Sequence, residues 1–225
     1  MASHLPPALA DLLAYFGPLA SGREEVAGGV ALHTPETNVL ALNAALLPGT
    51  RPERLREAAA WQQARGRPPL LGVEGRGGKE AVASFRVGRS QADSLPSPFV
   101  VEQVSRLHLP QWAAVLAEAH GTPEWAGALT RHLASRLEGA RGYTLLLAYA
   151  GGEAEAVGAL LWQAAGTGGR AHLWGTLDPA VDRPLLGSAA RLSEPLWVSV
   201  PPDSPATVEG EREVSFILMN PAGNP

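Results

Sequence analysis

Hydrophobic and polar positions along this chain follow two different periods. Two stretches place their buried-face positions at the three- and four-residue spacing of a helix that covers a core with one side. These positions are Leu55, Ala58, Ala59 and Gln62 in the first stretch and Leu129, Leu133 and Leu137 in the second. A glycine follows each stretch, Gly66 and Gly142. Because a helix commonly ends at a left-handed residue, the pattern predicts two helices that stop at these glycines.

Each predicted helix precedes a strand–turn–strand pattern. The first reads LLGVE, GRGGK and EAVASFRV over residues 70–87, and the second reads YTLLLAYA, GGEAE and AVGALLWQ over residues 143–163. Glycines in both turns allow the positive φ values that tight hairpins need. The sequence therefore predicts two hairpins, one after each helix.

Further elements are expected on either side of these patterns. Residues 8–16 read as a first helix, and the polar, proline-containing segment 88–98 reads as a linker. After the second hairpin the chain reads RAHLWGTL, a turn with a short helix, EPLWVSV and REVSFILMN (residues 170–177, 178–192, 194–200 and 212–220). We predict a third strand of the meander, a helix and two closing strands.

The chain nearly repeats itself. LHTPE, GTRPE, ARG and KEAVASF in the first half have counterparts LHLPQ, GTPE, ARG and AEAVGAL in the second, in the same order. The spacing is roughly 71 to 76 residues throughout, which favours a duplicated unit. We accordingly divide the chain into a reduced N-terminal half, residues 1–95, and a C-terminal domain, residues 96–225.

Composition narrows the classes of function. Apolar residues make up 45% of the 225 residues, the formal net charge is −4, and there are no cysteines. A sizeable core is expected, thiolate chemistry is excluded, and without a run of basic residues nucleic acid is not an expected partner. No apolar run reaches the ~18 residues of a membrane span, and the N-terminus lacks the basic start of a signal peptide. We expect a cytoplasmic bacterial protein, monomeric or homodimeric, that does not bind a membrane.

The second half resembles a specific family. A strand (residues 99–107) precedes two helices (111–120 and 124–138), a hairpin with the core AY-x-GG-x-x-x-AVGALL, and then strand, turn, helix and strand up to residue 200. This order resembles the GCN5-related N-acetyltransferases, the GNAT superfamily, and the first half resembles a degenerate copy. The resemblance implies an α/β (α+β) fold with a mixed, mostly antiparallel sheet flanked by helices.

The resemblance also implies a place for acetyl-CoA. In the family, the strand after the hairpin contacts the acyl group, and the loop that opens the next helix binds the pyrophosphate through backbone N–H groups. The corresponding residues here are Thr176, Leu177, Arg183, Leu186, Gly187, Ser188 and Ala189. The family loop is altered, because Asp182 or Pro184 stands at its Gln/Arg position and Leu185 replaces a glycine in one register. We predict a phosphate loop that is present in outline and eroded in detail.

Candidates for acid–base chemistry are His120, Glu124 and His172. A GNAT reaction needs a base for the amine and an acid for the thiolate, and a pKa near the working pH suits both. Each residue also has a structural interpretation: a histidine at a helix end binds orphan carbonyls, and Glu124 complements a helix dipole. No tyrosine follows Tyr149, so the family's usual acid has no counterpart, and no metal-binding spacing of histidines occurs.

Two functions remain open from the sequence. The first is an N-acetyltransferase that transfers an acyl group from acyl-CoA to an amine of a small molecule or peptide. The second is a GNAT-like module without catalysis that binds a ligand or takes part in assembly. The element order favours the first, and the altered loop favours the second.

Overall fold

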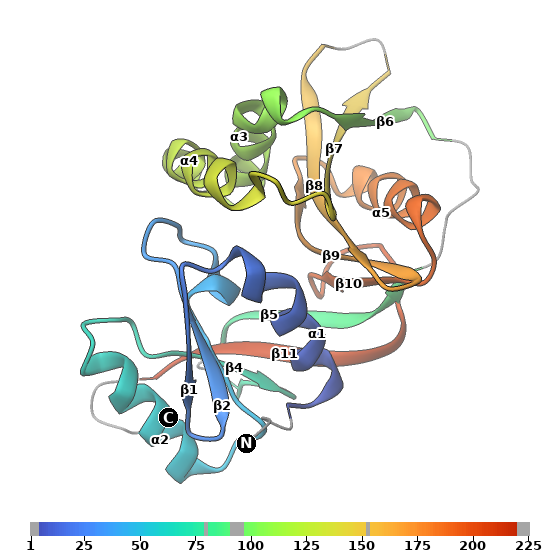
Figure 1. Cartoon of the computed structure of the whole chain (residues 1–225). Coiled ribbons are helices and arrows are strands. Elements are labelled where there is room, and N and C mark those ends of the chain that lie inside the picture. Colours follow the sequence, from blue (N-terminus) through green and yellow to red (C-terminus); the bar gives the residue numbers. More distant parts are fainter. Residues whose placement is uncertain (1–4, 79–80, 91–96, 152–153, 220–225) are drawn as a thin grey trace. The chain divides into compact units, whose positions relative to one another are not determined.

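The structure is a computed structural model that describes residues 5–78, 81–90, 97–151 and 154–219. The chain forms two compact units: unit 1 comprises Met1–Val87 and Arg212–Pro225, and unit 2 comprises Gly88–Glu211. Each unit has a mixed, mostly antiparallel sheet flanked by helices (Figure 1), which confirms the predicted fold class. Parts of the predicted linker 88–98, the turn residue Gly152 and the last residue of the predicted closing strand lie outside the described residues.

In the part of the chain that the structure describes, unit 1 contains six neighbouring strands. Its elements are α1 (Pro7–Phe16), β1 (Gly22–Val26), β2 (Gly29–His33), β3 (Ala45–Leu46), α2 (Pro52–Gln63), β4 (Leu70–Glu74), β5 (Ala81–Ser90) and β11 (Glu209–Leu218). The strands follow the order β1-β2-β3-β4-β11-β5, and only the β3–β4 pair among the registered pairs is parallel. The helix α2 packs Ala58 and Ala59 against Leu71, Val73 and Ile217 of the sheet.

Unit 2 has helices on both faces of its sheet. Its elements are β6 (Phe99–Val104), α3 (Leu109–Ala119), α4 (Ala126–Leu137), β7 (Tyr143–Ala150), β8 (Ala156–Ala165), β9 (Gly168–Thr176), α5 (Asp182–Leu192) and β10 (Leu196–Val200). Figure 1 shows α3 and α4 on one side of β7 and β8 and α5 on the other. The order is β10-β9-β8-β7-β6, and only β9–β10 is parallel.

Short 3₁₀ turns complete the described chain at Gly17–Leu19, Leu40–Leu42, Arg106–His108, Pro123–Trp125 and Pro179–Val181. The left-handed glycine predicted after the first amphipathic helix is confirmed, with φ +66° at Gly66. After α4 the positive φ falls at Gly139 and not at Gly142, because α4 ends at Leu137 and the chain turns at once.

The two halves of the chain have the same order of elements, in a register that the sequence did not reveal. A helix, three strands, a helix and two strands occur as α1-β1-β2-β3-α2-β4-β5 and again as α4-β7-β8-β9-α5-β10-β11. In both sets the first three strands pair antiparallel and the third and fourth pair parallel. Matching elements start about 120 to 130 residues apart, as with Gly22 and Tyr143. The repeat expected at 71 to 76 residues is therefore wrong.

The predicted first hairpin, over residues 70–87, is also wrong. The strand β11 lies between β4 and β5 and pairs antiparallel with β4, from Val214 opposite Glu74 to Leu218 opposite Leu70. The chain that leaves β4 therefore does not return beside it. The second hairpin is confirmed, since β7 pairs directly with β8. The end of β11 belongs to unit 1, whereas the sequence assigned this strand to the C-terminal domain.

Candidate functional site

A bulge in β9 changes which neighbouring strand the backbone N–H and C=O groups of a given residue face. The N–H of Gly169 donates to Pro195 O, at the β10 side, and the N–H of Leu177 donates to Val157 O, at the β8 side. In an unbroken strand these two residues, an even number apart, would face the same neighbour. The register between β8 and β9 shifts between Leu161 and Gln163, which reverses the direction. After the bulge, Trp174 and Thr176 direct their backbone N–H and C=O groups away from β8.

The strands β9 and β10 part soon after they meet. Their registered pairs are Leu196–Gly169, Trp197–Arg170 and Val198–Ala171, after which β9 continues to Thr176. Side chains bridge the two strands beyond this point. The indole Nε1 of Trp174 donates to Ser199 O at 2.7 Å, and the hydroxyl of Ser199 lies 3.5 Å from His172 O. Because Trp174 is 7% exposed, its indole fills space within the core at the point where the strands diverge.

His120, the residue that follows α3, contacts the backbone of β9. Nε2 of His120 lies 3.0 Å from the carbonyl oxygen of Trp174. A carbonyl only accepts, so Nε2 carries the proton of the ring. Gly175 makes this approach possible, because a Cβ at that position would lie 2.9 Å from Cβ of Ala119 and 3.3 Å from Nε2 of His120. The sequence predicted that this helix-end histidine binds orphan carbonyls of a helix end, whereas the carbonyl that it contacts belongs to β9.

The turn between β9 and α5 is held by carboxylates of the chain itself. The side chain of Asp178 accepts the N–H of Ala180 at 2.8 Å. Asp182, the first residue of α5, is 5% exposed and accepts hydrogen bonds from the hydroxyls of Thr176 and Ser204. A negative charge in the first turn of a helix is favourable, so the Asp182 carboxylate complements the dipole of α5.

The segment after β10 folds over this turn. Nε of Arg183 donates to Pro205 O at 2.9 Å, and the hydroxyl of Ser204 also accepts the N–H of Ala206 at 3.2 Å. Ala206 is buried with the residues of α5 and β10. The Nε of Arg183, which was predicted as a phosphate ligand, thus donates to the protein's own backbone. Pro184 has no N–H to offer in the same turn.

The small residues predicted as phosphate contacts lie farther along α5. Leu186 and Ala189 are buried in the core between α5 and the sheet, and Gly187 is buried too. Ser188 is half-buried, and Leu177 is exposed just after β9. Gly187, Ser188 and Ala189 therefore fall in the middle of the helix, beyond the N-terminal turn whose N–H groups are available to a ligand.

The remaining candidates have separate surroundings. His172 is 7% exposed and lies on β9 within the bulged stretch, and its carbonyl faces the Ser199 hydroxyl. Glu124 is exposed in the turn Pro123–Trp125 that precedes α4. His120 contacts the backbone of Trp174.

The parallel strands β3 and β4 of unit 1 correspond to β9 and β10 of unit 2, but they stay paired to the end of β3. Ala45 and Leu46 of β3 pair with Leu71 and Gly72 of β4, and the N–H of Leu47 continues the ladder to Gly72 O at 2.9 Å. The side chain of Leu46 covers Gly72 so closely that a Cβ there would lie 2.6 Å from Leu46 Cδ2. The pair does not part before β3 ends.

Two solved structures from bacteria are similar to this chain over most of its length. A functionally unknown conserved protein from Staphylococcus epidermidis is 11% identical and has a TM-score of 0.58 over 83% of this chain and 90% of that protein. A candidate acetyltransferase from the GNAT family of Novosphingobium aromaticivorans is 10% identical and has a TM-score of 0.53 over 95% of this chain and 97% of that protein. The chain has the GNAT fold. No family model and no curated protein matches the sequence.

At identities of 10–11%, the similarity extends to the fold and not to individual residues. The turn before α5 does not fit the coenzyme A site that the resemblance implies, because its first helical residue is a buried carboxylate, Asp182, bonded to Ser204, and Arg183 is bonded to Pro205 O. Within the described ranges no group of three or more metal-ligating side chains occurs. Nor is any described helix long and apolar enough to cross a membrane.

Sequence reasoning identified Asp182 as a residue that repels phosphate, but it missed the residues that hold it. Ser204 and Thr176 lie on different segments, 22 and 6 residues away along the chain. The role of Trp174 between β9 and β10 was also missed, although its pairing with Ser199 O satisfies a polar group in the core. The only local signal was the Thr-x-x-x-x-x-Asp spacing across a strand–helix turn, which many structural turns share.

Proposed function

We propose that this chain is a non-catalytic GNAT-fold protein, a binding or assembly module that does not transfer an acyl group. The observation that carries the proposal is the Asp182 carboxylate at the first turn of α5, hydrogen-bonded to Thr176 and Ser204. A diphosphate brought to the N–H groups of the first turn of α5 would lie near a buried negative charge, and repulsion in a buried site is weakly screened.

A second observation supports the same conclusion. Where β9 and β10 part, the indole of Trp174 is bonded to Ser199 O, and His120 is bonded to Trp174 O. Two backbone carbonyls beside the opening, Trp174 O and Ser199 O, therefore already accept side-chain donors of the chain. In unit 1 the parallel strands remain paired through Leu47. In unit 1 no ladder opens at the corresponding point, and in unit 2 the opening between β9 and β10 contains the indole of Trp174.

We propose further that residues 1–95 and 96–225 are two GNAT-like halves in tandem. The repeated element order supports this. Bacterial origin and a cytoplasmic location remain part of the proposal, as does a monomeric or homodimeric state.

Thermal unfolding with acetyl-CoA and with coenzyme A tests the central proposal. A ligand at 100 times its Kd stabilises a protein by about 2.7 kcal/mol, which is easily measured. We expect no shift of Tm with either compound at millimolar concentration. The variant Asp182→Asn with Ser204→Ala, which removes the charge and one donor to it, tests whether the carboxylate alone is responsible. A saturable Tm increase in the wild-type protein contradicts the proposal.

The second candidate is an N-acetyltransferase that uses acetyl-CoA and an amine of a small molecule or peptide. One observation favours it: the bulge in β9 and the early end of β9–β10 pairing direct backbone groups of Trp174 and Thr176 away from β8. His120 and Glu124 would then be the groups nearest to the acceptor side in the family arrangement. Transfer of the radiolabelled acetyl group from acetyl-CoA to an amine in a mixture, with release of coenzyme A and at a rate that Trp174→Ala abolishes, would establish this candidate.

A further inference from the structure

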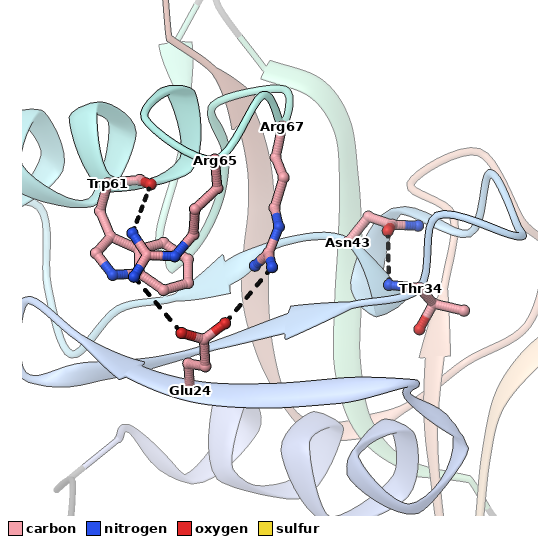
Figure 2. Close-up of polar contacts among 6 residues, drawn as sticks. All are labelled: Glu24, Thr34, Asn43, Trp61, Arg65 and Arg67. Carbon is pink, nitrogen blue, oxygen red and sulfur yellow. Dashed lines mark hydrogen bonds and ion pairs between the residues drawn. The ribbon is translucent and has the colours of Figure 1, made fainter.

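Two arginines in unit 1 converge on one side of the sheet. They follow α2, where Gly66 adopts φ +66° and the N–H groups of Arg65 and Arg67 both donate to Gln62 O. This tight turn directs the alternate side chains Arg65 and Arg67 toward β1. Figure 2 shows both guanidinium groups pointing at Glu24, with Trp61 beside them.

The indole of Trp61 fixes the guanidinium groups. The guanidinium carbon of Arg65 lies 3.9 Å from the ring centroid of Trp61, and Nη1 of Arg65 donates to Trp61 O at 3.3 Å. The guanidinium carbon of Arg67 lies 5.3 Å from the same centroid. A guanidinium stacked on a ring keeps its N–H edge available for an oxyanion and loses little entropy when it binds one.

Glu24 does not satisfy both arginines. Its carboxylate oxygens lie 3.7 Å from Arg65 and 3.5 Å from Arg67, longer than the 2.7–2.9 Å typical of a charged N–H···O bond. Nη1 of Arg67 is buried and has no hydrogen-bond acceptor among the residues that the structure describes. Because the protein covers this atom, the donors that a bound oxyanion would reach are the Nη2 atoms of Arg65 and Arg67, which face the long contacts to Glu24.

The charge of Arg67 also acts on a neighbouring histidine. Burial, and next the charge of Arg67, lower the pKa of His33, against the smaller opposing effects of Glu36 and Glu24. His33 lies opposite Gly22 in the β1–β2 pair, two positions from Glu24 along that strand pair. The positive field of Arg67 at this histidine thus exceeds that of either neighbouring glutamate.

We propose that Trp61, Arg65 and Arg67 form a binding site for a single oxyanion group, the carboxylate or phosphate of a small molecule. The bound group takes the place of the Glu24 carboxylate and accepts one Nη2 proton from each arginine. Glu24 is 46% exposed at its side chain, so it is free to move toward solvent. The site lies in unit 1 and is independent of the absence of acyl transfer in unit 2.

Titration of the ¹⁵N-labelled full chain with inorganic phosphate and with succinate, at pH 7 and constant ionic strength, tests the site by NMR. We expect saturable shifts of the amides of Glu24, Arg65 and Arg67 with at least one of the two anions, and comparison of the two identifies which oxyanion is preferred. Sodium chloride serves as the reference, and shifts that do not saturate or that chloride reproduces overturn the proposal.

Variants separate a specific site from general attraction. Arg67→Gln is expected to weaken binding at least tenfold, since it removes a charged donor. Arg23→Gln, the matched control on β1, makes the same change of charge at an exposed neighbour of Glu24 and is expected to leave binding within twofold. Glu24→Gln removes the competing charge and is expected to tighten binding. Equal losses in the two arginine variants, or weaker binding by Glu24→Gln, overturn the proposal, and the glutamate variant keeps the test informative if Arg67→Gln does not fold.

Discussion

Replacement of Asp182 by alanine isolates the contribution of the carboxylate at the start of α5. The side chain is 5% exposed and accepts two hydroxyl donors, Thr176 and Ser204. Each hydrogen bond to a charged group contributes about 1.5–3 kcal/mol, and the helix dipole adds about 0.3–1 kcal/mol. Because the two bonds share one acceptor and are not additive, we expect Asp182→Ala to lower the free energy of unfolding by about 3–5 kcal/mol.

Urea unfolding followed by circular dichroism measures this change as a shift of the midpoint at an unchanged m-value. Asp182→Asn, which keeps one carbonyl acceptor and loses the charge, is expected to cost about 2 kcal/mol. The control is Asp203→Ala, an exposed aspartate in the same loop, for which we expect a change within about 0.5 kcal/mol. In a double-mutant cycle, Asp182→Ala and Ser204→Ala should couple by about 1 kcal/mol or more. An Asp182→Ala protein as stable as wild type would refute the reasoning, because the carboxylate would then not be held by these donors.

Two further predictions concern unit 1. Burial and Arg67 lower the folded-state pKa of His33, so on acidification the unfolded chain takes up this proton first. The contribution of His33 to stability should therefore be full above pH 6.5 and be lost as the pH falls below that value. Chemical denaturation between pH 8 and 5 measures this loss, which should be smaller in His33→Asn. A Cβ at Gly29 would lie 2.1 Å from Leu46 O, so Gly29→Ala should cost about 2 kcal/mol or more in urea unfolding, whereas Gly49→Ala, with nothing within 4 Å, should change stability by less than about 0.5 kcal/mol. Equal pH profiles of the two His33 proteins, or equal effects at the two glycines, would contradict these accounts.

Local patterns in the sequence predicted the helices and the β7–β8 hairpin because the residues that determine them are close along the chain. The spacing of Leu129, Leu133 and Leu137 places all three on the buried face of α4, as expected. The position of β11 was not predictable in this way. Its residue Val214 pairs with Glu74, and the same alternating pattern would suit an edge strand beside β10 equally well. Only the competition among strands for a place in the sheet decides this, and no local signal records it.

The candidate site shows the same division. The sequence identified the strand–turn–helix segment around Asp182 and the doubtful chemistry of its first turn, and the structure places this turn between β9 and α5. The sequence did not reveal that Ser204 returns to this carboxylate after β10, nor that the indole of Trp174 bridges to Ser199. Both contacts join segments more than twenty residues apart, so they depend on the tertiary fold.

A crystal structure of the protein grown with millimolar acetyl-CoA tests the central claim most directly. The account predicts that Asp182 remains hydrogen-bonded to Thr176 and Ser204, that Arg183 remains on Pro205 O, and that no diphosphate lies at the start of α5. A coenzyme A diphosphate bound to the N–H groups of this turn, with the loop that carries Ser204 and Pro205 displaced, would contradict it.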